Sequence, residues 1–221
     1  MSKYNLPKGY LSYSQINKYL TCARDYEYAY VHGTPYVSPF VAILGNAVHE
    51  GVAGYLQEII DGGAADVSHG IDVMEDYVDK RVEEGDFENI KESVDQTLTW
   101  ASICYQGWVQ QVAAKFKPKR VEWEIKKDLG DVPFLAYIDL QAEDADGEIV
   151  LDQKITGRAK TQSFVNSSLQ LSIYSALTGI SRVGIISVIR PTKIVKPSDI
   201  KVIINTSTRT DRDRNHAISV V

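Results

Sequence analysis

Residues 133–155, PFLAYIDLQAEDADGEIVLDQKI, predict two β-strands joined by a turn. The strands are expected over Pro133 to Ala142 and Glu148 to Ile155, and the acidic, glycine-ended residues between them form the turn. Strand side chains alternate between the two faces of a sheet, so Asp152 and Lys154 point the same way, and the hairpin can bring Asp139 beside them. Two carboxylates and one ammonium group then share a small volume.

Charged residues inside strands that are otherwise apolar require a reason. Two neighbouring carboxylates repel each other unless a cation neutralises them, and Mg²⁺ or Mn²⁺ does so through oxygen ligands. The nearby lysine could orient or deprotonate a water molecule and offset charge on a phosphate. A structural ion pair on a half-exposed sheet explains the same spacing equally well, so the spacing leaves both interpretations open.

The segments around this hairpin predict helices before it and further strands after it. Helical spacing covers Gln15 to Val31 (capped by Ser12-Tyr13-Ser14), Gly45 to Ile60, Gly70 to Glu84, Glu88 to Phe116 and Phe164 to Leu177. Strand patterns cover Val121 to Leu129, Val183 to Ile189 and Ile200 to Asn205. The segment His32 to Pro39 breaks helix periodicity, and Arg209 to Arg214 is predicted to be a polar connector. The tyrosine-rich stripe of the first helix is assigned to the core, and His49 to the first turns of the second helix. The predicted fold class is α/β (α+β mixed), with a helical portion (1–116) wrapped on a central mixed sheet (117–221) in a single domain, 1–221.

Composition and charge are those of an ordinary globular chain. The 221 residues are 44% hydrophobic and 24% charged, and the longest apolar runs are too short to span a membrane, so an intracellular, cytoplasmic location is the default expectation. The net charge of −5 is uneven: residues 1–110 carry 7 basic and 16 acidic residues (−9), and residues 111–221 carry 17 and 13 (+4). An anionic partner is therefore expected to meet the second half.

The order of short motifs along the chain resembles the RecB-like branch of the PD-(D/E)XK nuclease superfamily. The motifs are Leu11-Ser12-Tyr13-Ser14 through Cys22-Ala23-Arg24-Asp25-Tyr26-Glu27-Tyr28, then Gly45-Asn46-Ala47-Val48-His49-Glu50, Asp139, Asp152-Gln153-Lys154 and Gln170-Leu-Ser-Ile-Tyr174. Each motif is weak alone, and their ordered succession over residues 11–174 is fairly specific. The resemblance implies a restriction-endonuclease-like core, and it includes CRISPR-associated adaptation exonucleases and the AddB and RecB nuclease domains.

The resemblance also implies roles for individual residues. Metal ligands are expected at His49, Asp139, Asp152 and the backbone carbonyl of Gln153, and Lys154 is the expected catalytic lysine. The imidazole favours Mn²⁺ somewhat over Mg²⁺. Substrate-positioning roles fall to Gln170, Tyr174, Arg24 and Arg158, with Lys160 as a further candidate for phosphate contact; Glu122 and Glu124 could support the site but are assigned no role.

The cysteine content departs from the pattern of many such relatives. They hold an iron–sulfur cluster with one cysteine in the opening motif and three near the C-terminus, whereas this chain has only Cys22 and Cys104. No iron–sulfur cluster is expected in this chain, either because this member lacks one or because the sequence is a fragment without its cluster-binding tail.

The sequence therefore predicts a metal-dependent deoxyribonuclease. The expected activity is exonucleolytic hydrolysis of single-stranded DNA or duplex ends in recombination or repair, with DNA as partner and no membrane. A partner protein from recombination or replication and a homo-oligomeric state stay open. The competing hypothesis is a non-catalytic nucleic-acid-binding or assembly module on a degenerate nuclease fold.

Overall fold

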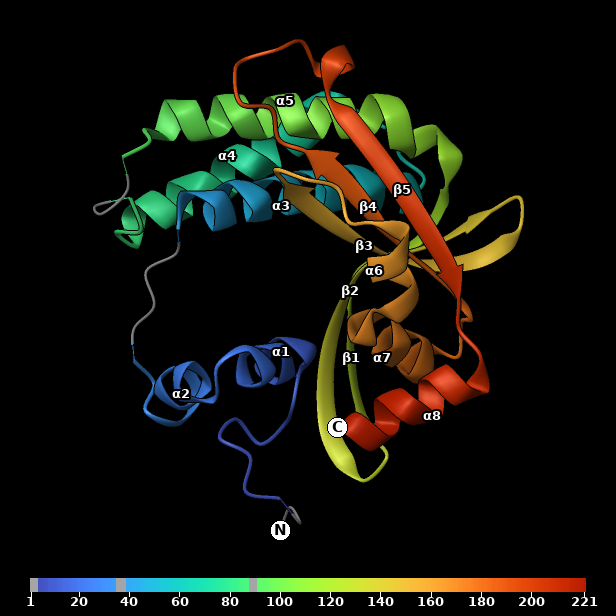
Figure 1. Cartoon of the computed structure of the whole chain (residues 1–221). Helices are drawn as coiled ribbons and strands as arrows, with labels where there is room; N and C mark the ends of the chain where they lie inside the picture. The colour runs from blue at the N-terminus through green and yellow to red at the C-terminus, as the bar shows by residue number, and fades with distance from the viewer. Residues whose placement is uncertain (1–3, 35–38, 88–90) are drawn as a thin grey trace.

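The computed structural model describes residues 4–34, 39–87 and 91–221. Its centre is a five-stranded sheet in the order β1-β2-β3-β4-β5, with helices on both sides (Figure 1). The strands are β1 (Lys117–Leu129), β2 (Val132–Asp144), β3 (Gly147–Thr156), β4 (Arg182–Ile189) and β5 (Lys201–Thr208). Only the β3–β4 pair is parallel among these neighbours. The predicted mixed sheet and α/β fold class are confirmed.

The helices form two groups around the sheet. One group consists of α3 (Phe40–Ile60), α4 (Val67–Glu83) and α5 (Val94–Val112), which lie against one another above the sheet in Figure 1. The other consists of α6 (Gln162–Ser167), α7 (Leu169–Thr178) and α8 (Asp211–Val220), with α1 (Tyr13–Thr21) and α2 (Ala23–Tyr26) set apart from them across β1 and β2 in Figure 1. No helix among the described residues has the length and apolar character needed to cross a lipid bilayer.

Two hydrophobic clusters hold these layers together, one on each side of β3. Leu151 is fully buried in the cluster with α3, α4 and α5, and its neighbour Val150 is fully buried in the cluster with α7 and α8. Burying one such side chain contributes about 1.5–3 kcal/mol. Strand β2 contributes to both clusters, because Ile138 belongs to the second and Leu140 to the first. Asp139 therefore lies where the strand passes from one core to the other.

The pairing of β2 with β3 ends beside the predicted active-site residues. The paired residues run from Asp144 and Gly147 to Leu140 and Leu151. Beyond that point β3 continues along β4, whereas β2 continues along β1 and takes the N-terminal segment on its other side, where Leu11 exchanges two backbone hydrogen bonds of 2.8 Å with β2. The two strands form a fork.

The first predicted helix is divided. The chain turns extended at Cys22 (φ −159°, ψ 104°), which separates α1 from α2, and a π-helical turn (Glu27–Val31) follows. The assignment of its tyrosine-rich stripe to the core was wrong, because Tyr19 and Leu20 of that stripe are 56% and 65% exposed and only Ile16 joins a cluster of buried residues.

Other predicted boundaries shift for local reasons. Helix α3 begins at Phe40, after Pro39, so His49 lies in the middle of the helix and not in its first turns. The predicted helix over Phe164 to Leu177 is divided at Ser168, whose ψ of 115° is extended and whose hydroxyl caps α7. The predicted connector at Arg209 to Arg214 is instead the start of α8, which a capping box of Thr210 and Asp213 begins.

The remaining helices lie close to their predicted ranges. Asp66 caps α4 and moves its start three residues earlier, to Val67. Ser93 and Gln96 form the capping box of α5, whose end continues as a 3₁₀ turn over Ala113–Lys115. The first residues of the predicted helix over Glu88 to Phe116, and part of the break from His32 to Pro39, lie outside the described residues.

Candidate active site

Four predicted residues meet at the fork between β2 and β3. Asp139 lies on β2, Asp152 and Lys154 lie on β3, and His49 projects from the middle of α3. The fork places these residues at the boundary between the two hydrophobic clusters, where side chains from both helix groups can reach the same point.

Asp152 is the most enclosed charge of the site. Its side chain is 1% exposed, and Lys154 Nζ lies 3.0 Å from its Oδ1 and 2.9 Å from its Oδ2. Burial raises the pKa of Asp152 to about 6, although the ammonium group of Lys154 opposes that rise. A carboxylate in this setting needs donors to stay ionised, and Lys154 is the first of them.

Lys154 is held as a cation. Burial lowers its pKa, but the carboxylates of Asp152 and Asp139 outweigh that effect, so the pKa is raised above its ordinary value. A lysine that retains its proton can position a water molecule and stabilise negative charge, whereas it is a poor base. Of the two roles open from the sequence, the electrostatics favour the first.

Gln170 and Tyr174 of α7 complete the surroundings of Asp152. Gln170 Nε2 donates to Asp152 Oδ1 at 2.8 Å and lies 2.8 Å from the Tyr174 hydroxyl, which donates to the backbone carbonyl of Tyr137 at 3.0 Å. Burial and the carboxylates of Asp152 and Asp139 raise the pKa of Tyr174 well above 10, so its hydroxyl stays neutral. Gln170 and Tyr174, four residues apart on α7, thus connect Asp152 of β3 to the backbone of β2.

Asp139 joins β2, β3 and α3. Its Oδ2 accepts a hydrogen bond of 2.6 Å from the backbone N–H of Gln153, which replaces strand pairing at the fork. The same oxygen lies 3.6 Å from His49 Nδ1. The contacts of Asp139 with the described residues all involve Oδ2, so its second carboxylate oxygen, Oδ1, can bind a metal ion.

Glu122 of β1 joins this group, although the sequence assigned it no role. One ligand atom each from His49, Glu122 and Asp139 lie within 4.8 Å of one another. The β1–β2 pairs on either side, Val121 with Leu140 and Trp123 with Ile138, place Glu122 opposite Asp139. Desolvation and the carboxylates of Asp139, Glu50 and Asp152 raise the pKa of Glu122 to about 7.

The backbone at Glu122 is unusual. Its φ is 42°, in the left-handed region that side-chain-bearing residues seldom adopt, at a cost on the order of 1–2 kcal/mol. Strained backbone of this kind gathers at functional sites. The alternation of Glu122 and Glu124 along the strand did not distinguish the two, and the cross-strand register was the missing signal.

The donors present fit a hard divalent cation. Two carboxylates and one imidazole match Mg²⁺ or Mn²⁺, with the nitrogen better suited to Mn²⁺. The carboxylates of Asp139 and Asp152 contribute to the raised pKa of Glu122, and a cation bound there would offset that repulsion. Asp152 lies against this group, but its two oxygens face Lys154 and Gln170.

The predicted basic contacts lie outside this cluster. Arg24 on α2 hydrogen-bonds the Tyr28 hydroxyl at 3.2 Å, and its guanidinium lies over that ring. Arg158 is exposed just beyond β3, and Lys160 Nζ lies 4.8 Å from the centre of the Phe164 ring. Arg158 and Lys160 follow the end of β3, whereas Arg24 lies on α2 near the N-terminus.

Comparisons with known proteins identify one family. The family model of the PD-(D/E)XK nuclease superfamily matches residues 10–184, which include all the site residues above. The solved structure "Crystal structure of SSO0001" is 14% identical, with a TM-score of 0.34, over 65% of this chain and 66% of that one, so the match spans just under two thirds of it. No curated protein matches the sequence.

Proposed function

The chain belongs to the PD-(D/E)XK nuclease superfamily, and we propose that it is a divalent-metal-dependent deoxyribonuclease of the RecB-like branch. Membership implies a nuclease with a nucleic-acid substrate. The observation that carries the finer proposal is the meeting of His49, Glu122 and Asp139 within 4.8 Å, beside the ion pair of the buried Asp152 with Lys154. The contact of Gln170 with Asp152, and of Tyr174 with Gln170, supports the branch, because this helix motif is part of the resemblance.

The proposed metal ligands are His49, Asp139 and Asp152, with the backbone carbonyl of Gln153; Glu122 is added as a donor. A divalent ion bound there supplies a Lewis acid for the scissile phosphate and lowers the pKa of a bound water. Glu122 and Asp139 lie across from each other on paired strands, so the sheet presets their separation.

The residues of the chain then act on the phosphodiester. Lys154 stays protonated, orients the attacking water and stabilises the charge that develops on the phosphate. The water gives up one proton to solvent as its oxygen bonds to phosphorus in line with the leaving oxygen, the bond to the leaving oxygen breaks, and the leaving oxygen takes a proton from solvent. Gln170 is a positioning residue, because it fixes the orientation of Asp152.

The substrate proposed is single-stranded DNA or a duplex end, degraded exonucleolytically in recombination or repair. The charge of the chain supports a local grip, because β1 to β5 belong to the +4 half and the acidic excess lies in residues 1–110. Arg24 and Arg158 are the proposed phosphate contacts. Such contacts make binding sensitive to salt.

A degradation time course tests the proposal. Single- and double-stranded oligonucleotides labelled at the 5′ or the 3′ end are incubated with Mg²⁺, Mn²⁺ or chelator. We expect metal-dependent degradation by the wild type and none by Asp152→Ala or Lys154→Ala, with the circular dichroism spectra of all three alike. Unchanged activity in both variants would contradict the proposal.

The competing candidate is a binding module with an inactive site. The retention of metal donors at His49, Glu122 and Asp139 argues against it. Calorimetric titration with Mn²⁺ separates the two, because the nuclease binds the ion in a manner that depends on Asp139, whereas the inactive module takes up no ion tightly.

A further inference from the structure

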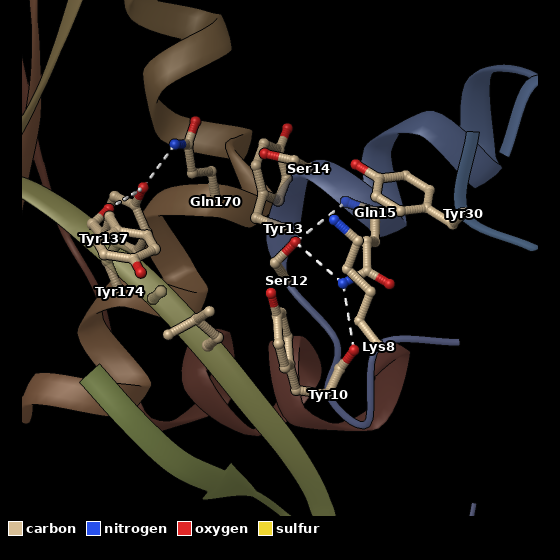
Figure 2. A pocket seen from close by; sticks show the side chains of 12 residues that line it. Lys8, Tyr10, Ser12, Tyr13, Ser14, Gln15, Tyr30, Tyr137, Gln170 and Tyr174 are labelled. Atoms are coloured by element: carbon tan, nitrogen blue, oxygen red, sulfur yellow. Dashed lines mark hydrogen bonds between the residues drawn. The ribbon is translucent and has the colours of Figure 1, made fainter. Parts of the chain in front are cut away.

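A cavity of about 260 Å³ opens beside the catalytic cluster (Figure 2). Its walls come from the segment before α1, the first turn of α1, the π-helical turn, β2 and α7. Five tyrosines and one lysine dominate the lining: Lys8, Tyr10, Tyr13, Tyr30, Tyr137 and Tyr174. The catalytic mechanism proposed above gives none of these six residues a step in the reaction.

The cavity and the catalytic cluster share a wall. Gln170 lines the cavity and also donates to Asp152 Oδ1. Tyr13, another lining residue, is close enough to Lys154 and Asp152 for their charges to act on it. A group seated in the cavity therefore lies next to the atoms that would receive a scissile phosphate.

A row of tyrosine rings leads from the surface to the cavity. The ring centres of Tyr19 and Tyr26 are 5.6 Å apart and those of Tyr26 and Tyr30 are 5.2 Å apart. Tyr19 is largely exposed, and Tyr30 lines the cavity with Lys8 Nζ 5.3 Å from the centre of its ring. Bases of unpaired nucleic acid stack on such rings without regard to sequence, and lysine pairs with the phosphates.

The walls are held in place before any ligand arrives. Gln15 is 1% exposed, and its Nε2 donates to the backbone carbonyl of Tyr10 at 3.2 Å and lies 3.4 Å from Ser12 Oγ. Leu11 is fixed to β2 by its two backbone hydrogen bonds. A preformed pocket binds its ligand without first ordering a loop.

We propose that this cavity receives one unstacked nucleoside of an unpaired DNA strand, next to the scissile phosphate. The inference rests on the proposed nuclease function and deepens it, since it selects single-stranded DNA over intact duplex. Tyr30 stacks on the base, Lys8 pairs with a neighbouring phosphate, and the Tyr19–Tyr26–Tyr30 row carries the following bases. The volume is below the about 300–1,000 Å³ of drug-sized ligand pockets, which suits a single base.

Substrates that lack one base at a chosen position test this proposed nucleoside-binding site in the active enzyme. Single-stranded substrates carry one abasic nucleotide at successive positions around the cleaved bond, and cleavage is followed with Mn²⁺. The wild type is expected to lose about tenfold in rate at one position beside the bond, the size of one lost base–aromatic stack. In Tyr30→Ala the same abasic nucleotide costs much less, because the ring and the base act together. A flat scan with an active enzyme overturns the inference.

Binding without catalysis tests the same site if no DNA is degraded. The anisotropy of a labelled single-stranded oligonucleotide is measured in chelator. Tyr30→Ala and Lys8→Ala are each expected to weaken binding about five- to tenfold. Tyr30→Phe, which keeps the ring, and Lys115→Ala, an exposed lysine beyond α5 in the other helix group, are expected to stay within about twofold of the wild type.

The two proposals fail in different ways. If Tyr30→Ala and Lys8→Ala bind the oligonucleotide as tightly as the wild type while metal-dependent degradation is intact, only the proposed nucleoside-binding role of the cavity is refuted. If the two variants bind more weakly as expected but the wild type degrades no DNA, only the nuclease function is refuted. Equal affinity for duplex and single strand in chelator also contradicts the nucleoside-binding role.

Discussion

Replacement of Gln170 by leucine isolates the contact that orients the buried carboxylate. The variant removes the amide that donates to Asp152 Oδ1 at 2.8 Å and lies 2.8 Å from the Tyr174 hydroxyl, while it keeps a side chain of similar size. Asp152 is 1% exposed, so water cannot easily replace the lost donor.

The expected cost follows from these two contacts. A hydrogen bond to a charged group contributes about 1.5–3 kcal/mol and a neutral one about 1 kcal/mol. Allowing for the apolar burial gained by leucine, the free energy of unfolding should fall by about 2–3 kcal/mol. In a chain of this length that fall lowers the melting temperature by roughly 5–10 °C. If the chain is a nuclease, its kcat falls as well.

Urea unfolding in chelator, at neutral pH, measures the change without interference from bound metal. The matched control is Gln106→Leu, which removes a glutamine on α5 with one neutral side-chain hydrogen bond of 2.9 Å to Ser102 and should cost no more than about 1 kcal/mol. A double-mutant cycle with Tyr174→Phe should show coupling of about 0.5 kcal/mol or more. A loss for Gln170→Leu no larger than that for Gln106→Leu would refute the reasoning.

Three further predictions concern other parts of the chain. The paired hydrogen bonds from Arg182, at 2.6 and 2.9 Å, hold the pKa of Asp144 below its ordinary 3.8. The urea midpoint of the wild type should therefore exceed that of Asp144→Asn at about pH 7, and the difference between the two midpoints should vanish as the pH falls through the native pKa of Asp144. A difference that persists in strong acid contradicts this. Burial raises the pKa of the Cys104 thiol to about 12, so iodoacetamide at about pH 8 should add one label, at the exposed Cys22, and mass spectrometry that finds two labels on the native protein would overturn the prediction. Glu122→Ala should weaken Mn²⁺ binding at least about tenfold by calorimetry, and an unchanged affinity would remove Glu122 from the ligand set.

Much of the sheet and part of the site could be predicted because strand periodicity is local. The alternation of Asp152 and Lys154 and the hairpin turn required only neighbouring residues, and the structure brings both beside Asp139. His49 came from the resemblance and not from its position, which was misplaced along its helix. Glu122 needed the register between β1 and β2, which no single strand encodes.

The helix interruptions were missed because single backbone angles cause them. Extended angles at Cys22 and Ser168 divide segments whose apolar spacing continues on both sides. The exposed tyrosines were missed for a different reason. Helical spacing identifies a stripe of large side chains, but whether another element covers that stripe depends on the tertiary arrangement, and here Tyr19 stays open to solvent.

Degradation of labelled single-stranded DNA by the wild type and by Lys154→Ala, side by side with Mn²⁺, tests the central claim most directly. The ion pair of the buried Asp152 with Lys154, beside the cluster of metal donors, predicts rapid degradation by the wild type, abolished by chelator, and none by a folded Lys154→Ala protein. Equal degradation by the two proteins, or degradation that continues in chelator, would contradict it.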